Sequence, residues 1–317
     1  MSTDTFLDPQ LAAAFRLAAE LQQLVGTPGP GVNGMRIHAE QARRWWNEGG
    51  PTMARELQVK IPVGRRELDA VVYVPREEIE PAPAYVYLHG GGFRIGSPRS
   101  NDRMLRELAA QWGGVVLSLD YVHVPEHVFP EAVEDTAAVY AWIADHGAAW
   151  GIDGKRLAFG GSSAGASVAL GAAIHLGPDR AAFLSAGALL VGTYSNDLDT
   201  ESARSFGGPG FAPTQAAAIS SLEQYVPDAA QRNDPRVDCV NADLAGMPPL
   251  FLAAAAIDVF RDSSRQLARA MHLQGRRCVL IEYEGMAHLF GGYTRLVDTA
   301  RRCVGDVAAF LTSELPA

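Results

Sequence analysis

The chain has 317 residues, of which 48% are hydrophobic and 20% are charged, and its formal net charge is −9. A chain of this length and composition can bury a large core and is neither disordered nor membrane-spanning. The acidic balance argues against nucleic acid as a partner, because phosphate binding needs clustered cations.

The first residues and the cysteine content favour a cytoplasmic location. Met-Ser-Thr-Asp-Thr-Phe-Leu-Asp contains no basic segment followed by an apolar block, so no secretory leader is expected. No uncharged apolar run reaches transmembrane length, and no membrane partner is expected. Cys239, Cys278 and Cys303 lack metal-like spacing, and their odd number favours free thiols.

The first part of the chain predicts helices followed by strands. Apolar residues recur at three- and four-residue intervals from Leu11 to Val25, which is typical of an amphipathic helix over 8–25. Pro28-Gly29-Pro30-Gly31 breaks this helix. The other elements expected here are a helix over 38–47 and strands over 55–63, 68–75 and 84–88.

Beyond residue 88 strands and helices alternate. This alternation predicts an α/β fold with a mostly parallel central sheet that has helices on both faces. Helices are expected over 102–112, 131–146, 164–176, 262–274 and 293–314, and strands over 115–119, 156–159, 183–191, 249–256 and 278–283. The segment 192–246, rich in Gly, Pro, Ser, Asp and Asn, interrupts the pattern between two strands.

Two glycine-containing motifs carry the chemistry. His89-Gly90-Gly91-Gly92-Phe93 follows a strand directly and can aim bare backbone N–H groups at a developing negative charge. Gly161-Ser162-Ser163-Ala164-Gly165 has the Gly-x-Ser-x-Gly spacing of a nucleophile elbow. Chance would give about 0.008 His-Gly-Gly-Gly runs at this composition. Together the motifs predict acyl transfer with Ser163 as nucleophile.

A serine nucleophile needs a histidine base. His175 lies one helix downstream of the elbow, and His272 lies inside a helical pattern. His288 follows a strand and the Glu284-Gly285 turn, so it lies where an α/β sheet presents ligand-facing groups. We therefore expect His288 to be the base.

The carboxylate that orients the histidine is chosen by the same logic. Asp258 lies just past the apolar strand expected over 249–256, at the end where ligand-facing groups gather. Asp262 is the rival, but it falls in the first turn of the next helix, where an acid caps free N–H groups. We expect Asp258 to hold the imidazole tautomer.

Several of these motifs resemble those of the hormone-sensitive-lipase-like esterases, a branch of the α/β-hydrolase fold. The resemblance runs from about residue 55 to the end. It rests on His89-Gly90-Gly91-Gly92-Phe93, Asp120-Tyr121, Pro125-Glu126-His127, Phe129-Pro130, Ser163-Ala164-Gly165, Asp258-Val259-Phe260-Arg261-Asp262 and Gly285-Met286-Ala287-His288.

This resemblance implies a serine carboxylesterase that hydrolyses short-to-medium acyl esters without a metal or organic cofactor. It places Gly91, Gly92 and the amide of Ala164 in an oxyanion hole. It also implies a cap built from residues 1–50 and 192–246, over a hydrolase core of residues 51–191 and 247–317.

The chain departs from the family pattern at a few positions. Ser162 precedes the nucleophile where the family usually has Asp, and Ala166 stands where it usually has Gly. Val122-His123-Val124 replaces a frequent Arg-Leu-Ala, and Leu289 replaces the Gly that usually follows the histidine. These departures leave the catalytic groups in place but change their surroundings.

Some residues also have structural interpretations. Ser163 could be an ordinary helix N-cap, although the upstream glycine motif argues against this. His89 is expected to fix the glycine loop, including Gly90, through hydrogen bonds, and Glu126 either supports the site or is purely structural. His123 and His127 are four residues apart, but Pro125 between them excludes a helical pair of metal ligands.

Two other functions are compatible with the motifs. One is an amidase or arylformamidase on the same fold, and the other is a non-catalytic ligand receptor on a hydrolase scaffold. Such receptors typically lack part of the triad, whereas this chain has all its members. The C-terminal helices either pack on a second copy, giving a homodimer, or simply cover the sheet.

Overall fold

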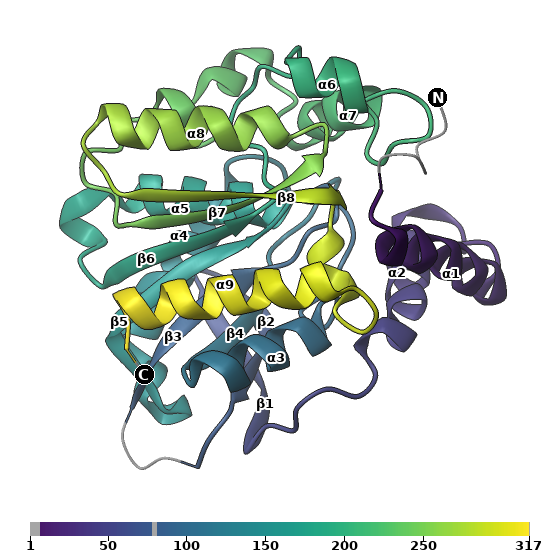
Figure 1. Ribbon diagram of the computed structural model, residues 1–317. Helices are drawn as coiled ribbons and strands as arrows, with labels where there is room; N and C mark the ends of the chain where they lie inside the picture. Colours follow the sequence, from purple (N-terminus) through teal and green to yellow (C-terminus); the bar gives the residue numbers. More distant parts are fainter. Residues whose placement is uncertain (1–6, 78–80, 317) are drawn as a thin grey trace.

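The computed structural model describes residues 7–77 and 81–316, and it is built on one sheet of eight strands (Figure 1). The strand order is β1-β2-β4-β3-β5-β6-β7-β8. β1 and β2 pair antiparallel, as do β2 and β4, and the other neighbours are parallel. The strands are β1 (Arg55–Val63), β2 (Arg66–Val74), β3 (Ala82–Leu88), β4 (Val115–Leu119), β5 (Ile152–Ser162), β6 (Leu184–Leu190), β7 (Leu250–Ile257) and β8 (Cys278–Ala287).

Helices cover both faces of this sheet (Figure 1). One face carries α3 (Asp102–Trp112) and α9 (Asp298–Glu314). The other face carries α4 (Glu131–His146), α5 (Ala164–Arg180) and α8 (Arg261–Leu273). The predicted α/β architecture with a mostly parallel sheet is confirmed.

Strand β3 shows why the sheet is buried on both sides. Val86 and Leu88 belong to the apolar cluster under α4, α5 and α8. Tyr85 and Tyr87 alternate with them and belong to the cluster under α3 and α9. Successive side chains of a strand point to opposite faces, so a nearly continuous apolar run such as 82–88 is expected between two helical layers.

Further helices lie at the end of the sheet where the parallel strands stop. α1 (Pro9–Val25) and α2 (Gly31–Asn47) form an antiparallel pair beside the sheet, and α6 (Glu201–Phe206) and α7 (Gln215–Tyr225) lie above it (Figure 1). Short 3-10 turns complete the described structure: η2 (Gly147–Trp150), η3 (Ala229–Asn233), η4 (Cys239–Asn241) and η5 (Phe290–Tyr293). Among the described residues no helix is both apolar enough and long enough to span a bilayer.

α2 begins at Gly31, well before the expected residue 38, and corrects that prediction. A Cβ on Gly34 would lie 2.1 Å from the carbonyl oxygen of Gly29. Because Gly34 has no side chain, the chain can turn tightly onto the first turn of α2. α1 ends at Val25 with Gly26 as its C-cap, and Pro30 stands at the N-cap of α2 with its restricted φ.

Some other boundaries also differ from those expected. β8 continues through Gly285, which adopts φ +70° in an irregular stretch of the β7–β8 pairing, so Glu284-Gly285 is a bulge and not a turn. α9 begins at Asp298, five residues later than expected, because Tyr293 packs against Phe15 and Trp46 and the chain turns there first. Residues 1–6, which support the expectation of no leader, lie outside the described residues.

Candidate active site

Ser163 lies in a strained turn between β5 and α5. Its φ of +52° is in a region that residues with side chains rarely adopt, and its N–H donates to the carbonyl oxygen of Leu190 at 2.8 Å. The flanking glycines allow this turn. A Cβ on Gly161 would lie 2.3 Å from the Leu88 carbonyl oxygen, and one on Gly165 would lie 2.2 Å from the same atom. The Gly-x-Ser-x-Gly spacing is therefore a packing requirement against the end of β3.

The structure brings Ser163, His288 and Asp258 together from three separate elements. His288 Nε2 lies 2.8 Å from Ser163 Oγ, and His288 Nδ1 lies 2.8 Å from Asp258 Oδ2. A carboxylate can only accept from a neutral imidazole, so Nδ1 carries the proton and Nε2 is free to accept from the serine. The second oxygen of Asp258 accepts from the Phe260 N–H at 3.1 Å. All three side chains are buried, so solvent competes little for these bonds.

Ser162, the other serine of the elbow, points elsewhere. Its Oγ lies 2.8 Å from the hydroxyl of Tyr87, on the α3 and α9 side of the sheet. Tyr87 in turn donates to Asn101 Oδ1 at 3.2 Å, so Ser162 is the donor to Tyr87. The pair fixes the strand end from which the elbow departs.

Asp262 is occupied by bonds to other groups. One of its oxygens accepts from the Ser202 N–H of α6 at 2.7 Å. The other accepts from Arg261 at 3.2 Å and from Arg265 at 3.1 Å. Among the described residues none of its hydrogen bonds reaches His288, so Asp262 ties the segment 192–246 to α8.

The glycine loop lies directly beside the serine. A Cβ on Gly90 would lie 3.2 Å from Ser163 Cβ, and the loop turns back through bonds from the Arg94 and Ile95 N–H groups to the Gly91 carbonyl, both 3.1 Å. Gly91 adopts φ +140°, and a Cβ there would lie 1.9 Å from the Ile95 carbonyl oxygen. Within residues 7–77 and 81–316 the N–H groups of Gly91, Gly92 and Ala164 have no protein acceptor.

His89 lies beneath this loop with its side chain wholly buried. The His89 Nδ1 donates to the Gly90 carbonyl at 3.0 Å, and the His89 carbonyl accepts from the Tyr121 hydroxyl at 3.1 Å. The ring of His123 lies 5.2 Å from that of His89, between centroids. Burial, and next the neighbouring His89, lower the pKa of His123 to about 3, so this imidazole is neutral at physiological pH.

Arg36 of α2 holds the chain just after the glycine loop. Its guanidinium donates to the carbonyls of Arg94 at 2.9 Å and Val124 at 3.1 Å. Glu126 accepts from the same guanidinium through both oxygens, at 3.0 and 2.7 Å. Hydrogen bonding from Arg36 lowers the pKa of Glu126 to about 2. Glu126 therefore acts on the loop only through Arg36.

The Arg36–Glu126 pair gives a pH-dependent contribution to stability. Because the pKa of Glu126 is lowered on folding, the contribution is complete above the ordinary carboxylate range and is lost as pH falls toward about 2. We expect Glu126→Gln to lower the melting temperature slightly at pH 7, with the difference from wild type shrinking below about pH 4.5. Thermal unfolding from pH 7 to pH 3 measures this, and a difference independent of pH would contradict it.

A cavity of about 480 Å³ opens over Ser163 and His288. Its walls come from α1, from the glycine loop and from the segment 192–246. They include Phe15, Ala18, Gln22, Gly91, Gly92, Phe93, Ala164, Thr193, Ser221, Leu222, Tyr225, Arg236 and Phe260. Among the aromatic residues of the segment 192–246, Tyr225 lines the cavity and stacks on Phe93 at 4.0 Å, between ring centroids. Phe206 and Phe211 line a neighbouring cavity, and Tyr194 is buried in the core.

Some residues of the site are not identified by the motifs. Arg36 and Tyr87 act from α2 and β3, and nothing in the sequence links them to the glycine loop or the elbow. Leu289 adopts φ +59°, the left-handed conformation that glycine takes without strain. The family usually has glycine at this position, which already indicates a left-handed residue after His288. In this chain a leucine adopts that strained conformation.

The comparisons with known proteins agree with this geometry. A family model described as the alpha/beta hydrolase fold matches residues 85–291. The structure is similar to that of EstE1, a thermophilic carboxylesterase cloned from a metagenomic library, with 30% identity, a TM-score of 0.86, and coverage of 90% of this chain and 98% of the other.

Two further solved structures are similar over nearly the whole chain. The esterase of Pyrobaculum calidifontis is 30% identical, with a TM-score of 0.85 over 97% of this chain and 98% of the other. An α/β-hydrolase enzyme from the metagenome of Lake Arreo is 26% identical, with a TM-score of 0.88 and 98% coverage of both chains. The chain belongs to the hormone-sensitive-lipase-like esterases, carboxylic ester hydrolases of the α/β-hydrolase fold.

Proposed function

We propose that this protein is a serine carboxylesterase that hydrolyses short-to-medium acyl esters through an acyl-enzyme intermediate. The observation that carries the proposal is the unbroken series of contacts from Asp258 through His288 to Ser163, with both hydrogen bonds at 2.8 Å. A serine hydroxyl is a weak nucleophile at neutral pH, and this arrangement supplies the base that it needs.

In the proposed reaction Ser163 Oγ attacks the ester carbonyl while His288 Nε2 takes its proton. The negative charge that develops on the carbonyl oxygen is stabilised by the free N–H groups of Gly91, Gly92 and Ala164. His288 then protonates the departing alcohol, and the acyl group stays on Ser163. Water, activated by His288, repeats the sequence and releases the acid. Asp258 stabilises the imidazolium in both halves.

The cavity supports the substrate class. At about 480 Å³ it lies in the lower half of the range for small-molecule sites, and most of its walls are apolar. An ester with a short or medium acyl chain fits such a space, whereas a long chain would have to extend beyond it. We also propose that α1 and α2 with the segment 192–246 form a cap, because α1 and this segment contribute walls to the cavity and α2 packs against α1.

A panel of matched substrates tests this function. We expect p-nitrophenyl esters with acyl chains of increasing length to be hydrolysed fastest at short and medium lengths. The corresponding p-nitroanilides should be cleaved at least about 100-fold more slowly, measured as kcat/KM. Equal or faster cleavage of the anilides would instead make the protein an amidase, and absence of turnover on the whole panel would exclude the esterase.

A further inference from the structure

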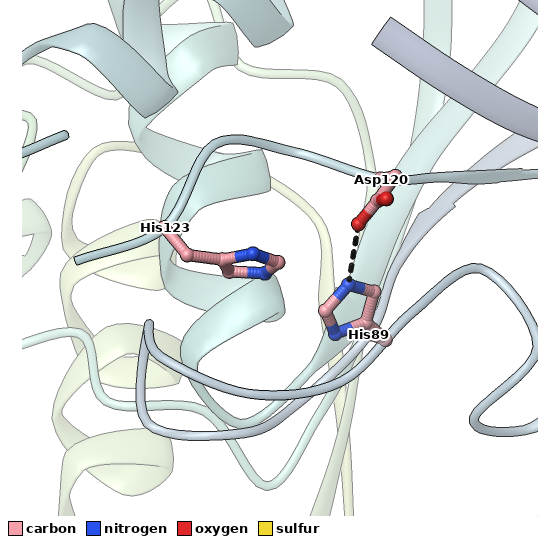
Figure 2. Close-up of side chains that lie close together, drawn as sticks. All are labelled: His89, Asp120 and His123. Carbon is pink, nitrogen blue, oxygen red and sulfur yellow. Dashed lines mark ion pairs between the residues drawn. The ribbon is translucent and has the colours of Figure 1, made fainter. Parts of the chain in front are cut away.

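His89, Asp120 and His123 form a cluster away from the catalytic cavity (Figure 2). His89 follows β3, Asp120 follows β4, and His123 lies on the loop that continues from Asp120. Each offers a ligand atom, and these atoms all lie within 4.8 Å of one another. Asp120 and His123 line a cavity of about 290 Å³ that shares no lining residue with the one around Ser163.

The hydrogen bond made by His89 determines which of its nitrogens is free. Nδ1 lies 3.0 Å from the Gly90 carbonyl oxygen, which can only accept, so Nδ1 carries the hydrogen. In the neutral ring Nε2 then has a lone pair, and it lies 3.7 Å from a carboxylate oxygen of Asp120 without a hydrogen bond. The His89 side chain is buried whereas that of Asp120 is partly exposed, and two electron-pair donors facing each other repel unless a cation lies between them.

His123 adds a second donor of the same kind. Its Nε2 is also buried without a hydrogen-bond partner, and Figure 2 shows its ring lying beside that of His89. Buried polar atoms in native proteins are nearly always paired, so two unpaired imidazole nitrogens beside one carboxylate need an explanation. His123 stands where the family frequently has leucine, so the third member of this cluster is a feature of this chain.

We propose that His89, Asp120 and His123 bind one divalent transition-metal ion of the zinc class. Two imidazoles and a carboxylate suit zinc and its neighbours, whereas magnesium and calcium prefer sites made wholly of oxygen atoms. Ligands about 2.0–2.1 Å from a tetrahedral ion lie about 3.4 Å apart, close to the observed 3.7 Å between His89 and Asp120. The loop bearing His123 needs to close by at most about 1.5 Å.

Such an ion would brace the glycine loop from the side opposite the substrate. His89 is followed directly by Gly90 and Gly91, so a bond at its ring joins the start of this loop to the end of β4. Glu67, Asp69 and Glu126 line the same cavity; Asp69 pairs with Lys60 and Glu126 with Arg36, which leaves Glu67 and Asp120 to favour the approach of a cation. The ion would have a structural role, because none of its ligands is Ser163, His288 or Asp258.

Titration of tag-free, metal-stripped protein with Zn²⁺ by calorimetry tests this site. We expect one ion per chain, a rise of several degrees in the melting temperature, and a visible absorption band when Co²⁺ replaces Zn²⁺. His123→Leu, which introduces the family's frequent residue, should weaken binding at least tenfold and abolish the rise. His127→Leu is the matched control from the same loop, since its ring is engaged by Glu131, and should bind as wild type does.

Two outcomes would overturn the proposal. If wild type binds no Zn²⁺ at millimolar concentration, the cluster is not a metal site. If His123→Leu binds one Zn²⁺ as tightly as wild type, the ion lies elsewhere, for example at His288, which that variant retains. Circular dichroism of each variant without metal verifies that the fold is intact.

Discussion

Replacing Ser163 with alanine is expected to lower kcat on an aryl acetate by at least about 10⁴-fold while the protein remains folded. The substitution removes the only hydroxyl that His288 contacts among the described residues, so no covalent intermediate can form. Alanine still has to adopt the positive φ of the elbow, which serine already tolerates. Steady-state kinetics together with a thermal melt separates loss of chemistry from loss of fold.

The neighbouring serine provides a matched control. Ser162 bonds to Tyr87 on the opposite side of the strand end, so Ser162→Ala should cost about tenfold or less in kcat. A fluorophosphonate probe followed by mass spectrometry should label wild type at residue 163 alone. Turnover retained by Ser163→Ala would rule out this nucleophile, and a wild-type protein that resists labelling would be a binding module on a hydrolase scaffold.

Replacing Asp258 with asparagine should be nearly as severe, with a loss of about 10⁴-fold in kcat. An amide can donate to Nδ1, which then favours the wrong imidazole tautomer and places a proton on Nε2 where the serine must donate. The shape of the side chain hardly changes, so the geometry of the site should survive. Comparing kcat with KM checks this, because substrate binding should be nearly unaffected.

The matched substitution is Asp262→Asn, four residues further along. Its carboxylate accepts from Ser202 and from two arginines but contacts no member of the triad. We expect less than a tenfold fall in kcat and a loss of about 1 kcal/mol in the free energy of unfolding. The reverse ranking of the two variants would exchange the roles of the two aspartates.

The sequence predicts best those helices and strands whose apolar periodicity and flanking breakers lie within one short segment. The helices over 102–112 and 131–146 and the strand over 115–119 have the predicted bounds, because their apolar periodicity and flanking breakers agree. β5 extends through Gly160 and Gly161, which local propensity disfavours in a strand. A Cβ on Gly160 would lie 1.8 Å from the Ala188 carbonyl oxygen, so close strand packing requires glycine there.

Some residues of the candidate site can likewise be predicted from local sequence, whereas others cannot. Ser163, Asp258 and His288 were predicted together because each follows a strand at the same edge of the sheet, and strand ends can be read from a sequence. The contacts of Arg36 and Tyr87 depend on how distant elements pack, and no local pattern records such packing. The same holds for the His89–Asp120–His123 cluster: spacing in the sequence suggests a pair of His123 with His127, whereas packing places His123 near His89 and Asp120.

The cavity over Ser163 takes part of its walls from the first helix and from the segment between β6 and β7, whereas Ser163, Asp258 and His288 each follow a strand of the sheet. In the proposed function, part of the cavity that accepts the ester is thus encoded apart from the residues that break its bond. Exchange of these outer pieces between relatives could diversify the accepted molecules without disturbing the reactive atoms.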